Sequence, residues 1–474
     1  MRPFVFILCQ KLYNGINWGD FMKSIIQNQK DYFYANNTKD IDTRIQNLKK
    51  LKSVIKNNEE KLLKSLYLDL KKSEFEAYAT EVGFVLASLS EFIKKLKRWS
   101  KKTKVSAKIH QPFSKNYIVN VPYGVSLIIG PYNYPFQLLI EPLIGAIAAG
   151  NTAILKPSEF TPHTSKLIKE MFDEAFDPRF IKVVEGGIQE TQELLNQDLD
   201  FIFFTGSVRV GSIIGELAGK RLIPCVLELG GKSPTIVHKD ANVKHAAKRI
   251  IWGKYINNGQ TCIAPDYVYV HEDIKEELLF ELKTEIIRSF TETPNTSKDY
   301  TRIVNGTHFD RLESLIKKDS IYHGGNTNKK DLFIEPTVLQ NISWEDSVMK
   351  EEIFGPILPV IEYKDIKEVK QKLINENNPL AFYVFTSDKK LSDELLYDVP
   401  SGGVCINDTI SHITNPKLPF GGMGSSGLGS YHGKQSYITF SHQKSVSKKV
   451  TWFDLKLVYP PYKNKVKIVR KIMK

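Results

Sequence analysis

Cys262 is the residue of this sequence best placed to act as a nucleophile. It ends the polar, turn-forming run Asn257-Asn258-Gly259-Gln260-Thr261-Cys262. A thiol attacks as its thiolate and has an ordinary pKa of about 8.5, so a catalytic Cys262 needs a helix N-terminus or a nearby cation. Considered alone, a single cysteine is more often an unreactive core residue. The assignment of Cys262 as a nucleophile therefore depends on finding other reactive groups near it.

A carboxylate lies 34 residues upstream, in the run Leu227-Glu228-Leu229-Gly230-Gly231-Lys232. Apolar neighbours raise the pKa of a carboxyl toward the range that suits a general base, because they remove it from water. Glu228 is therefore a candidate base. The alternative is a strand-end glutamate that pairs with Lys232.

The third candidate is Asn133, which lies between two prolines in the run Gly130-Pro131-Tyr132-Asn133-Tyr134-Pro135. The run follows a strand-like segment and precedes an apolar helical one. A side-chain amide in that place can donate a hydrogen bond to an oxyanion. An asparagine that caps a helix or forms a turn explains the same pattern.

Short apolar runs alternate with helical patterns around these residues. The expected strands are 125–129, 152–155, 180–184 and 201–204, and the expected helices are 136–149, 165–176, 190–195 and 210–218. This alternation predicts an α/β fold with a doubly wound parallel sheet, which binds ligands at the carboxyl ends of its strands. Helical spacing over residues 41–71 and 75–99 precedes it, and a second α/β region runs from about Ser233 to Pro419.

Two glycine-containing segments invite a dinucleotide interpretation. The segment Gly206-Ser207-Val208-Arg209-Val210-Gly211 follows an expected strand and opens a helix, so its N–H groups can hold a pyrophosphate. A structural strand–helix turn explains that segment about as well. The segment 422–427 has the literal GxGxxG spacing but neither follows a strand nor opens a helix. We interpret 422–427 as a flexible loop near a site.

The composition is that of a globular chain of 474 residues, with 42% hydrophobic and 25% charged residues. This length suggests two or three domains. The net charge of +13 would suit a polyanionic partner, but it is unevenly distributed. Residues 1–110 carry 22 basic and 11 acidic side chains and residues 441–474 carry 10 and one, which leaves 34 and 41 in the middle. The body is mildly acidic, so we expect no nucleic-acid partner.

The cysteines and the chain ends suggest a cytoplasmic protein. Four widely spaced cysteines without a CxxC pair favour neither a disulfide scaffold nor a metal site. The apolar run 4–9 is too short for a signal peptide, and Met22 is an alternative start that would make 1–21 an extension. The basic amphipathic tail 463–474 is expected to be solvated, with a peripheral membrane contact as the alternative.

Taken together, these motifs resemble the aldehyde dehydrogenase superfamily from about Met22 to Pro460. The glycine-flanked Glu228 and the Cys262 motif are its two signature sites. Five further segments match: Pro131–Pro135, Lys156-Pro157-Ser158-Glu159, Phe204–Ser207, Glu351-Glu352-Ile353-Phe354-Gly355-Pro356 and Pro419–Gly422. Four features are similar to the class 3, fatty-aldehyde branch: the Asn-Tyr-Pro sequence at Asn133, the run Cys262–Tyr267, the short N-terminal region and the basic tail.

The resemblance implies a fold and its domains. It implies a doubly wound NAD(P)-binding domain, an α/β catalytic domain and a small β oligomerisation arm, with a homodimer as the assembly. The expected boundaries are an N-terminal extension at 1–21, the NAD(P) domain at 22–100 and 121–229, the catalytic domain at 230–435, the arm at 101–120 and 436–455, and the tail at 456–474.

The resemblance also implies a mechanism and its residues. Cys262 would attack the aldehyde to form a thiohemiacetal and then a thioester, with Asn133 and the Cys262 N–H holding the oxyanion and Glu228 activating the hydrolytic water. NAD or NADP would be the cofactor, and medium- to long-chain aliphatic or aromatic aldehydes the substrates. The expected cofactor contacts are Lys156 and Glu159 at the adenosine ribose, Gly206, Ser207 and Gly211 at the pyrophosphate, and Glu352 and Phe354 at the nicotinamide ribose.

Two other activities compete with this interpretation. A CoA-acylating aldehyde dehydrogenase would pass the acyl group to a thiol, although Glu228 argues against it. A cysteine hydrolase without a cofactor belongs to a different class and needs a histidine partner for Cys262, for which the sequence shows no companion motif.

Overall fold

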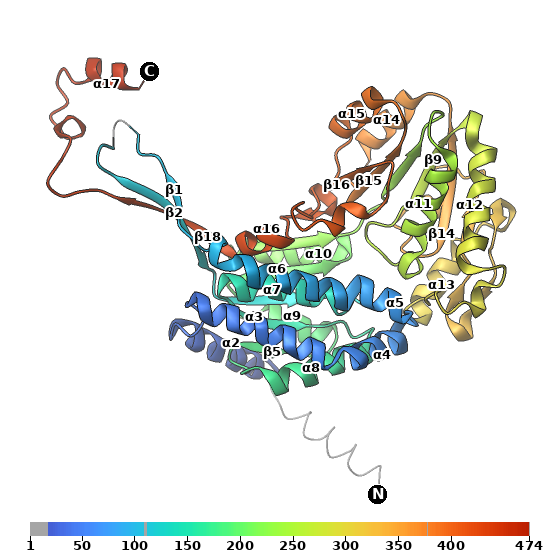
Figure 1. The fold of residues 1–474 in the computed structure, drawn as a ribbon, viewed down its shortest axis with the longest axis horizontal. Coiled ribbons are helices and arrows are strands. Elements are labelled where there is room, and N and C mark those ends of the chain that lie inside the picture. Colours follow the sequence, from blue (N-terminus) through green and yellow to red (C-terminus); the bar gives the residue numbers. More distant parts are fainter. Residues whose placement is uncertain (1–17, 109–110, 377, 474) are drawn as a thin grey trace, which may run out of the picture.

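The protein, seen in a computed structural model, is described over residues 18–108, 111–376 and 378–473. Two α/β bodies lie side by side, and a narrow β arm extends from the first of them (Figure 1). Most of the expected N-terminal extension, residues 1–17, lies outside the described ranges. Helix α2 (Trp18–Tyr34) begins the described chain and buries Met22 completely.

The first body is built on a six-stranded sheet of order β17-β7-β6-β3-β4-β5. Its strands are β3 (Val125–Ile129), β4 (Thr152–Lys156), β5 (Ile181–Val183), β6 (Phe201–Gly206), β7 (Cys225–Leu229) and β17 (Gly427–Leu428). All neighbours are parallel except β17, which pairs antiparallel with β7. The chain leaves β3 in one direction along the sheet and returns to β6 on its other side. The sheet therefore has its ligand-binding switch point between β3 and β6.

Both faces of this sheet are buried, which is why its strands are apolar throughout. Ile128 packs into one core, whereas Leu127 and Ile129 pack into the core on the opposite face. Helices α3, α4, α6, α7, α8 and α16 contribute to the first core, and α2, α9 and α10 to the second. These helices are α3 (Ile41–Asn57), α4 (Glu59–Leu70), α6 (Gly83–Trp99), α7 (Gln137–Ala149), α8 (Pro162–Ala175), α9 (Ile188–Leu195), α10 (Val208–Arg221) and α16 (Gly433–Thr439).

The N-terminal helical segments are more divided than their periodicity predicts. The stretch 41–71 is broken at Asn58 into α3 (Ile41–Asn57) and α4 (Glu59–Leu70). Leu48, Leu51, Leu62 and Leu66 nevertheless all reach the same core, so the apolar spacing does not reveal the break. The stretch 75–99 consists of α5 (Glu74–Ala77), a π-helical turn (Tyr78–Val82) and α6 (Gly83–Trp99).

The second body is built on a seven-stranded sheet of order β10-β13-β14-β9-β8-β15-β16, parallel except for β10. Its strands are β8 (Pro234–Val237), β9 (Tyr267–His271), β10 (Ile321–His323), β13 (Thr337–Leu339), β14 (Ile357–Tyr363), β15 (Ala381–Phe385) and β16 (Gly403–Ile406). Helices α11 (Val243–Tyr255) and α12 (Lys275–Phe290) bury one face. The other face is covered by α13 (Gly306–Ser314), α14 (Ile366–Asn375) and α15 (Lys389–Asp398). A small hairpin, β11 (Thr327–Asn328) and β12 (Phe333–Ile334), lies outside this sheet.

The arm is a three-stranded antiparallel sheet of β1 (Thr103–Val105), β2 (Lys115–Pro122) and β18 (Ser441–Lys448). It projects from the first body, and the C-terminal segment with α17 (Val466–Ile472) lies beyond it (Figure 1). Over the described ranges, no helix is long and apolar enough to cross a membrane. The predicted α/β class with parallel sheets is confirmed, whereas the exact domain boundaries stay a prediction.

Candidate active site

The carboxyl edge of the first sheet gathers the residues that the sequence singled out. Asn133 follows β3, Lys156 ends β4, Gly206 ends β6 and Glu228 lies one residue before the end of β7. The strand register places Lys156 beside Ile129 and Glu228 beside Thr205. Residues far apart in the chain therefore share one edge at the switch point, where an open α/β sheet binds its ligand.

Glu228 is buried without a partner. It is 3% exposed, and neither of its carboxyl oxygens has a hydrogen-bond partner among the described residues. Removal from water raises its pKa well above the ordinary value, as its apolar neighbours predicted. The alternative pair with Lys232 is not formed, because the Lys232 ammonium contacts the Asp266 carboxylate and donates to the carbonyl oxygen of Glu351 at 2.9 Å. Glu228 is thus a buried carboxyl that no hydrogen bond holds in the described part of the chain.

Cys262 is preceded by a left-handed turn between α11 and β9. Asn257, Asn258 and Gly259 have φ values of 52°, 57° and 72°. Asparagine and glycine are the residues that tolerate this conformation best. A Cβ at Gly259 would lie 2.3 Å from the carbonyl oxygen of Gly355, so the position also demands glycine for space. The left-handed backbone before Cys262 therefore explains why asparagine and glycine occupy these three positions.

The thiol of Cys262 is half-buried, and its pKa is raised. Burial is the largest cause, followed by the nearby carboxyls of Glu352 and Glu228. The N–H groups of Cys262 and Ile263 act in the opposite direction. The sequence led us to expect a helix N-terminus or a nearby cation, and the main influences on this thiol among the described residues include no cation. The resting group is a thiol, and its deprotonation has to accompany the reaction.

Asn133 is fixed next to the loop that carries the thiol. Its side chain is 3% exposed, and its Nδ2 donates to the carbonyl oxygen of Gln260 at 2.9 Å. An amide NH₂ has two N–H donors, so one is held by this bond and the other is left for a ligand. The hydroxyls of Tyr134 and Thr261 lie 2.7 Å apart and join the same two segments. Asn133 and Cys262 thus belong to one rigid unit.

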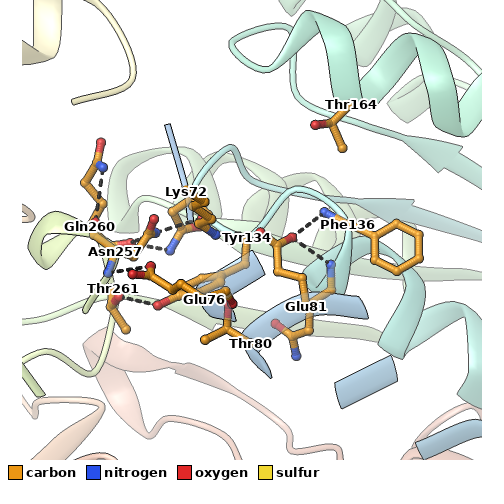
Figure 2. Close-up of polar contacts among 12 residues, drawn as sticks. Lys72, Glu76, Thr80, Glu81, Tyr134, Phe136, Thr164, Asn257, Gln260 and Thr261 are labelled. Carbon is orange, nitrogen blue, oxygen red and sulfur yellow. Dashed lines mark hydrogen bonds and ion pairs between the residues drawn. The ribbon is translucent and has the colours of Figure 1, made fainter. Parts of the chain in front are cut away.

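A charged cluster behind Asn133 was not predicted from the sequence. It consists of Lys72 and Glu81, which are buried, and Glu76, which is half-buried, and all three come from the segment between α4 and α6 (Figure 2). No motif marks these residues, and the interval from Glu76 to Glu81 places them on different faces of an ordinary α-helix. The signal in the sequence was limited to two acids, Glu76 and Glu81, among the mostly apolar residues 75–87.

The residues expected at the cofactor fit a dinucleotide. Lys156 is 2% exposed, and its Nζ donates to the carbonyl oxygen of Pro157 at 2.8 Å and lies 3.7 Å from Glu159 Oε2. The hydroxyl of Thr205, at the end of β6, is buried without a partner among the described residues. A buried cation and an unpartnered hydroxyl at the switch point suit ribose and phosphate oxygens.

Helix α10 presents its N-terminus at the same edge. Ser207 caps this helix, since its Oγ accepts the N–H of Val210 at 3.4 Å. Gly211 allows α10 to pack closely on β7, because a Cβ there would lie 2.4 Å from Leu229 Cδ2. Gly206 lies directly before the cap. Gly211 thus allows α10 to lie close to the sheet, and the N-terminus of α10 supplies N–H groups that favour an anion.

The segment with Glu352 and Phe354 comes from the second body. Arg311 Nη2 donates to the carbonyl oxygen of Ile353 at 2.5 Å, and the Ile353 N–H donates to Asp266 Oδ1 at 2.9 Å. Burial, together with the negative charge of Asp266, raises the pKa of Glu352 to about 8. Asp266, Arg311 and Lys232 were not singled out from the sequence in this supporting role.

Two contacts place this segment against the first body. The carboxyl of Glu352 lies against Gly230, where an added Cβ would be 2.2 Å from Oε2. Phe354 has a φ of 52° and contacts the Tyr132 ring edge-on, with a centroid distance of 5.9 Å. A non-glycine residue in the left-handed region costs about 1–3 kcal/mol and is typical of functional sites. The two bodies therefore meet at Glu352 and Phe354, beside the loop after Glu228.

The comparisons with known proteins agree with this site. The sequence model of the Aldehyde dehydrogenase family matches residues 20–446. The 4,4'-diaponeurosporen-aldehyde dehydrogenase of Staphylococcus aureus is 46% identical over 447 residues, which cover 94% of this chain and 97% of that protein. The dimeric NADP-preferring aldehyde dehydrogenase of Rattus norvegicus is 41% identical over 420 residues, with coverages of 89% and 93%.

The solved structures show the same relationship. The substrate-bound AldH of Staphylococcus aureus superimposes with a TM-score of 0.94 at 45% identity, covering 95% of this chain and 99% of that one. The fold and these comparisons define an NAD(P)-dependent oxidoreductase. The chain belongs to the aldehyde dehydrogenase family. The resemblance noted from the sequence, including its class 3 character, is confirmed.

Proposed function

We propose that this enzyme oxidises medium- to long-chain aliphatic or aromatic aldehydes to carboxylic acids, with Cys262 as nucleophile and Glu228 as general base. One observation carries the proposal above all others. The unpartnered carboxyl of Glu228 lies within electrostatic reach of the Cys262 thiol, whose pKa it helps to raise. A buried acid that faces a thiol and has no structural partner is what a base that activates water requires.

The reaction begins at Cys262. Its Sγ loses a proton and attacks the aldehyde carbon, which turns the carbonyl oxygen into the oxyanion of a thiohemiacetal. The free N–H of Asn133 Nδ2 and the N–H of Cys262 are the donors proposed for this oxyanion. One such donor contributes about 3–4 kcal/mol to the transition state. The bond from Asn133 to Gln260 keeps the amide in place before the substrate arrives.

Collapse of the oxyanion leaves a thioester on Cys262. Bound NAD(P) supplies the acceptor for the hydride that is released. Lys156, Glu159 and the turn Gly206–Gly211 are proposed to hold its adenosine ribose and pyrophosphate, and Glu352 and Phe354 its nicotinamide ribose. Glu228 then removes a proton from water, and the hydroxide attacks the thioester to release the acid. The covalent intermediate divides one difficult step into two.

An aldehyde panel tests the substrate class and the cofactor preference together. Saturated aldehydes of increasing chain length and benzaldehyde are each supplied with NAD and with NADP, and reduced cofactor is followed at 340 nm. We expect kcat/KM to rise with chain length. A preference for acetaldehyde over every longer or aromatic substrate would refute the proposed substrate class. An absence of reduced cofactor with any aldehyde would refute the activity.

The two competing activities have direct tests. Adding CoA and looking for acyl-CoA identifies an acylating enzyme, and we expect the free acid instead. A cofactor-free hydrolase needs an imidazole beside Cys262. In the described part of the chain, the imidazole found against a thiol belongs to His412, whose Nδ1 lies 3.2 Å from the Sγ of Cys405. Among the described residues, no hydrogen bond joins a histidine to the Cys262 thiol, which supports the oxidation over the hydrolysis.

We also propose a homodimer. The arm projects from the body and carries exposed aromatic residues, with Phe113 57% and Trp452 72% exposed. Such a surface favours burial against another subunit. A relative of this chain is named as dimeric. Sedimentation at micromolar concentration should give a dimer, and a monomer would contradict it.

The cytoplasmic location stays a prediction, and the basic tail is expected to remain in solvent. Helix α17 is short and exposes Val466, Ile468 and its lysines. Liposome flotation of the full chain and of a truncation after Pro460 separates the alternatives. Binding that is lost on truncation would establish a peripheral membrane contact and refute the solvated tail.

A further inference from the structure

A buried ion pair lies directly behind Asn133. The side chains of Lys72 and Glu81 are both 0% exposed, and Lys72 Nζ lies 2.5 Å from Glu81 Oε1. The same ammonium donates to the main-chain oxygen of Asn133 at 2.9 Å and lies 4.1 Å from the centroid of the Tyr134 ring (Figure 2). Of these three contacts of Lys72, one is with Glu81 and the other two are with the segment that contains Asn133.

The second oxygen of Glu81 holds the start of α7. It accepts the N–H group of Phe136 at 2.9 Å (Figure 2) and that of Gln137 at 3.2 Å. Glu81 lies in the π-helical turn Tyr78–Val82. Such turns shift the side chains that follow them and are frequent at functional sites. The ion pair thus holds the Asn133 segment through its main chain on both sides of Pro135.

Glu76 extends the cluster to the loop that carries the nucleophile. Its Oε1 accepts the N–H of Asn257 at 2.8 Å. The side chain of Asn257 in turn donates to the main-chain oxygens of Asn133 at 2.8 Å and Gln260 at 3.1 Å. Asn257 is the first left-handed residue of the turn before Cys262. Glu76 therefore stabilises a backbone conformation that is unfavourable by itself.

Stability alone does not account for this charged cluster. Desolvation of two buried ions offsets much of their attraction, and well-packed apolar residues are often as stable in their place. The contacts of this cluster converge on Asn133 and on the turn before Cys262, which come from different bodies of the fold. The arrangement is therefore better explained by positioning than by folding energy.

We propose that Lys72, Glu76 and Glu81 are positioning residues for catalysis: they fix the Asn133 amide and the Cys262 loop relative to each other so that both oxyanion donors point to one place. The inference rests on the proposed function, because it assumes that an oxyanion forms on a substrate bound to Cys262. A displacement of about 1 Å at such a site can cost about 100-fold in rate.

The ion pair is tested by a double variant, Lys72→Met with Glu81→Gln, which removes both charges of the pair together. The probe is 4-nitrophenyl acetate without cofactor, since acylation of a thiol by this ester needs the oxyanion donors but no hydride transfer. We expect acylation of Cys262 to slow by about 100-fold. Alkylation of Cys262 by iodoacetamide, which forms no oxyanion, should keep the wild-type rate.

Arg44→Met provides the matched control. Arg44 is also a buried cation, and it donates to the main-chain oxygens of Thr38 and Lys39 at 2.9 Å and of Ala148 at 3.3 Å. These carbonyls do not belong to the site. We expect this variant to lower the melting temperature while acylation stays at the wild-type rate.

The outcomes separate this inference from the proposed function. The positioning role would be overturned if the double variant were acylated at the wild-type rate. It would also be overturned if the rates of acylation and alkylation fell by the same factor, because that result indicates a structural role. If the wild type is acylated at Cys262 but oxidises no aldehyde, the proposed function fails while the comparison of variants still decides the positioning role. If the wild type is not acylated at Cys262 at all, both ideas are overturned.

Glu76→Gln tests the third member, because the amide keeps an oxygen for the Asn257 N–H and removes the charge. Burial raises the pKa of Glu76 to about 7, with Glu81 and Asp299 acting in the same direction and Lys72 in the opposite one. Ionised Glu76 accepts the stronger hydrogen bond. The ratio of wild-type to variant acylation rates should therefore rise as pH passes through about 7. A ratio that is independent of pH would remove Glu76 from the proposal.

Discussion

Gly230→Ala tests how closely the loop after Glu228 approaches the cofactor segment. An alanine Cβ at this position would lie 2.2 Å from Glu352 Oε2 and 2.5 Å from Oε1. An ordinary contact begins at 3.4 Å, so the carboxylate has to retreat by about 1.2 Å. Gly230 is not among the glycines with positive φ, which means that alanine fits its backbone. The substitution should displace one carboxylate without unfolding the loop.

The expected consequence is a slower hydride transfer. Misplacement of a positioning group by about 1 Å costs about 100-fold in rate. Stopped-flow measurement of the first turnover should therefore show reduced cofactor forming about 100-fold more slowly. Acylation of Cys262 by 4-nitrophenyl acetate should be unchanged, because Glu352 is proposed to hold the cofactor ribose and not the oxyanion.

A control variant and a compensating variant test whether the effect of Gly230→Ala comes from the displaced carboxylate. Gly219→Ala lies in α10, where an added Cβ meets nothing within 4 Å, so it should stabilise the protein by about 0.4–1 kcal/mol without affecting turnover. Glu352→Asp combined with Gly230→Ala shortens the displaced side chain and should recover part of the lost rate. A Gly230→Ala enzyme with a normal first turnover would refute the assigned role of Glu352.

Two other predictions concern the active site, and a third concerns Glu141, a buried residue of α7 whose Oε2 accepts the Ser88 hydroxyl at 2.9 Å. Cys262→Ala should abolish aldehyde oxidation while cofactor binding, measured by fluorescence quenching, persists; turnover above the enzyme-free background would contradict the nucleophile assignment. Glu228→Gln should slow thioester hydrolysis by about 100-fold or more and produce a burst of reduced cofactor in stopped-flow, whereas an unchanged steady state counts against the base. Glu141 is 1% exposed, and burial raises its pKa to about 8 from an ordinary 4.5, so the folded state binds more protons than the unfolded state between these values. Its contribution to stability is present below about pH 4.5 and is lost as pH rises to about 8, by about 1.4 kcal/mol per pH unit. Glu141→Gln should remove that slope in urea unfolding measured across this pH range, and equal slopes in the two proteins would refute the assignment.

The parallel strands and their motifs were predictable from the sequence because each depends on a local pattern. The apolar run 201–204 followed by Gly206 and Ser207 identifies a strand, its end and a capped helix within a few residues. The division of 41–71 at Asn58 was not predictable in the same way. Apolar residues on both sides of Asn58 reach one core, so the periodicity continues through the break.

The electrostatics of the thiol show the same limit of local reasoning. A helix N-terminus or a cation was expected near Cys262, but the main influences on its pKa are burial, two carboxyls and backbone N–H donors. Glu228 and Glu352 lie 34 residues before and 90 residues after Cys262 in the chain. Their approach depends on how the two bodies pack, which no local pattern reports.

The sequence by itself determined the fold class and the family and predicted the reactive groups, since these depend on residue types at short, ordered spacings. The tertiary structure decided which of those groups are buried and what holds them. Glu228 is buried and has no hydrogen-bond partner among the described residues. The packing of residues 72–81 against Asn133 creates a charged cluster that no sequence motif predicts. The physical reason is that desolvation and hydrogen bonding depend on neighbours in space, which come from distant parts of the chain.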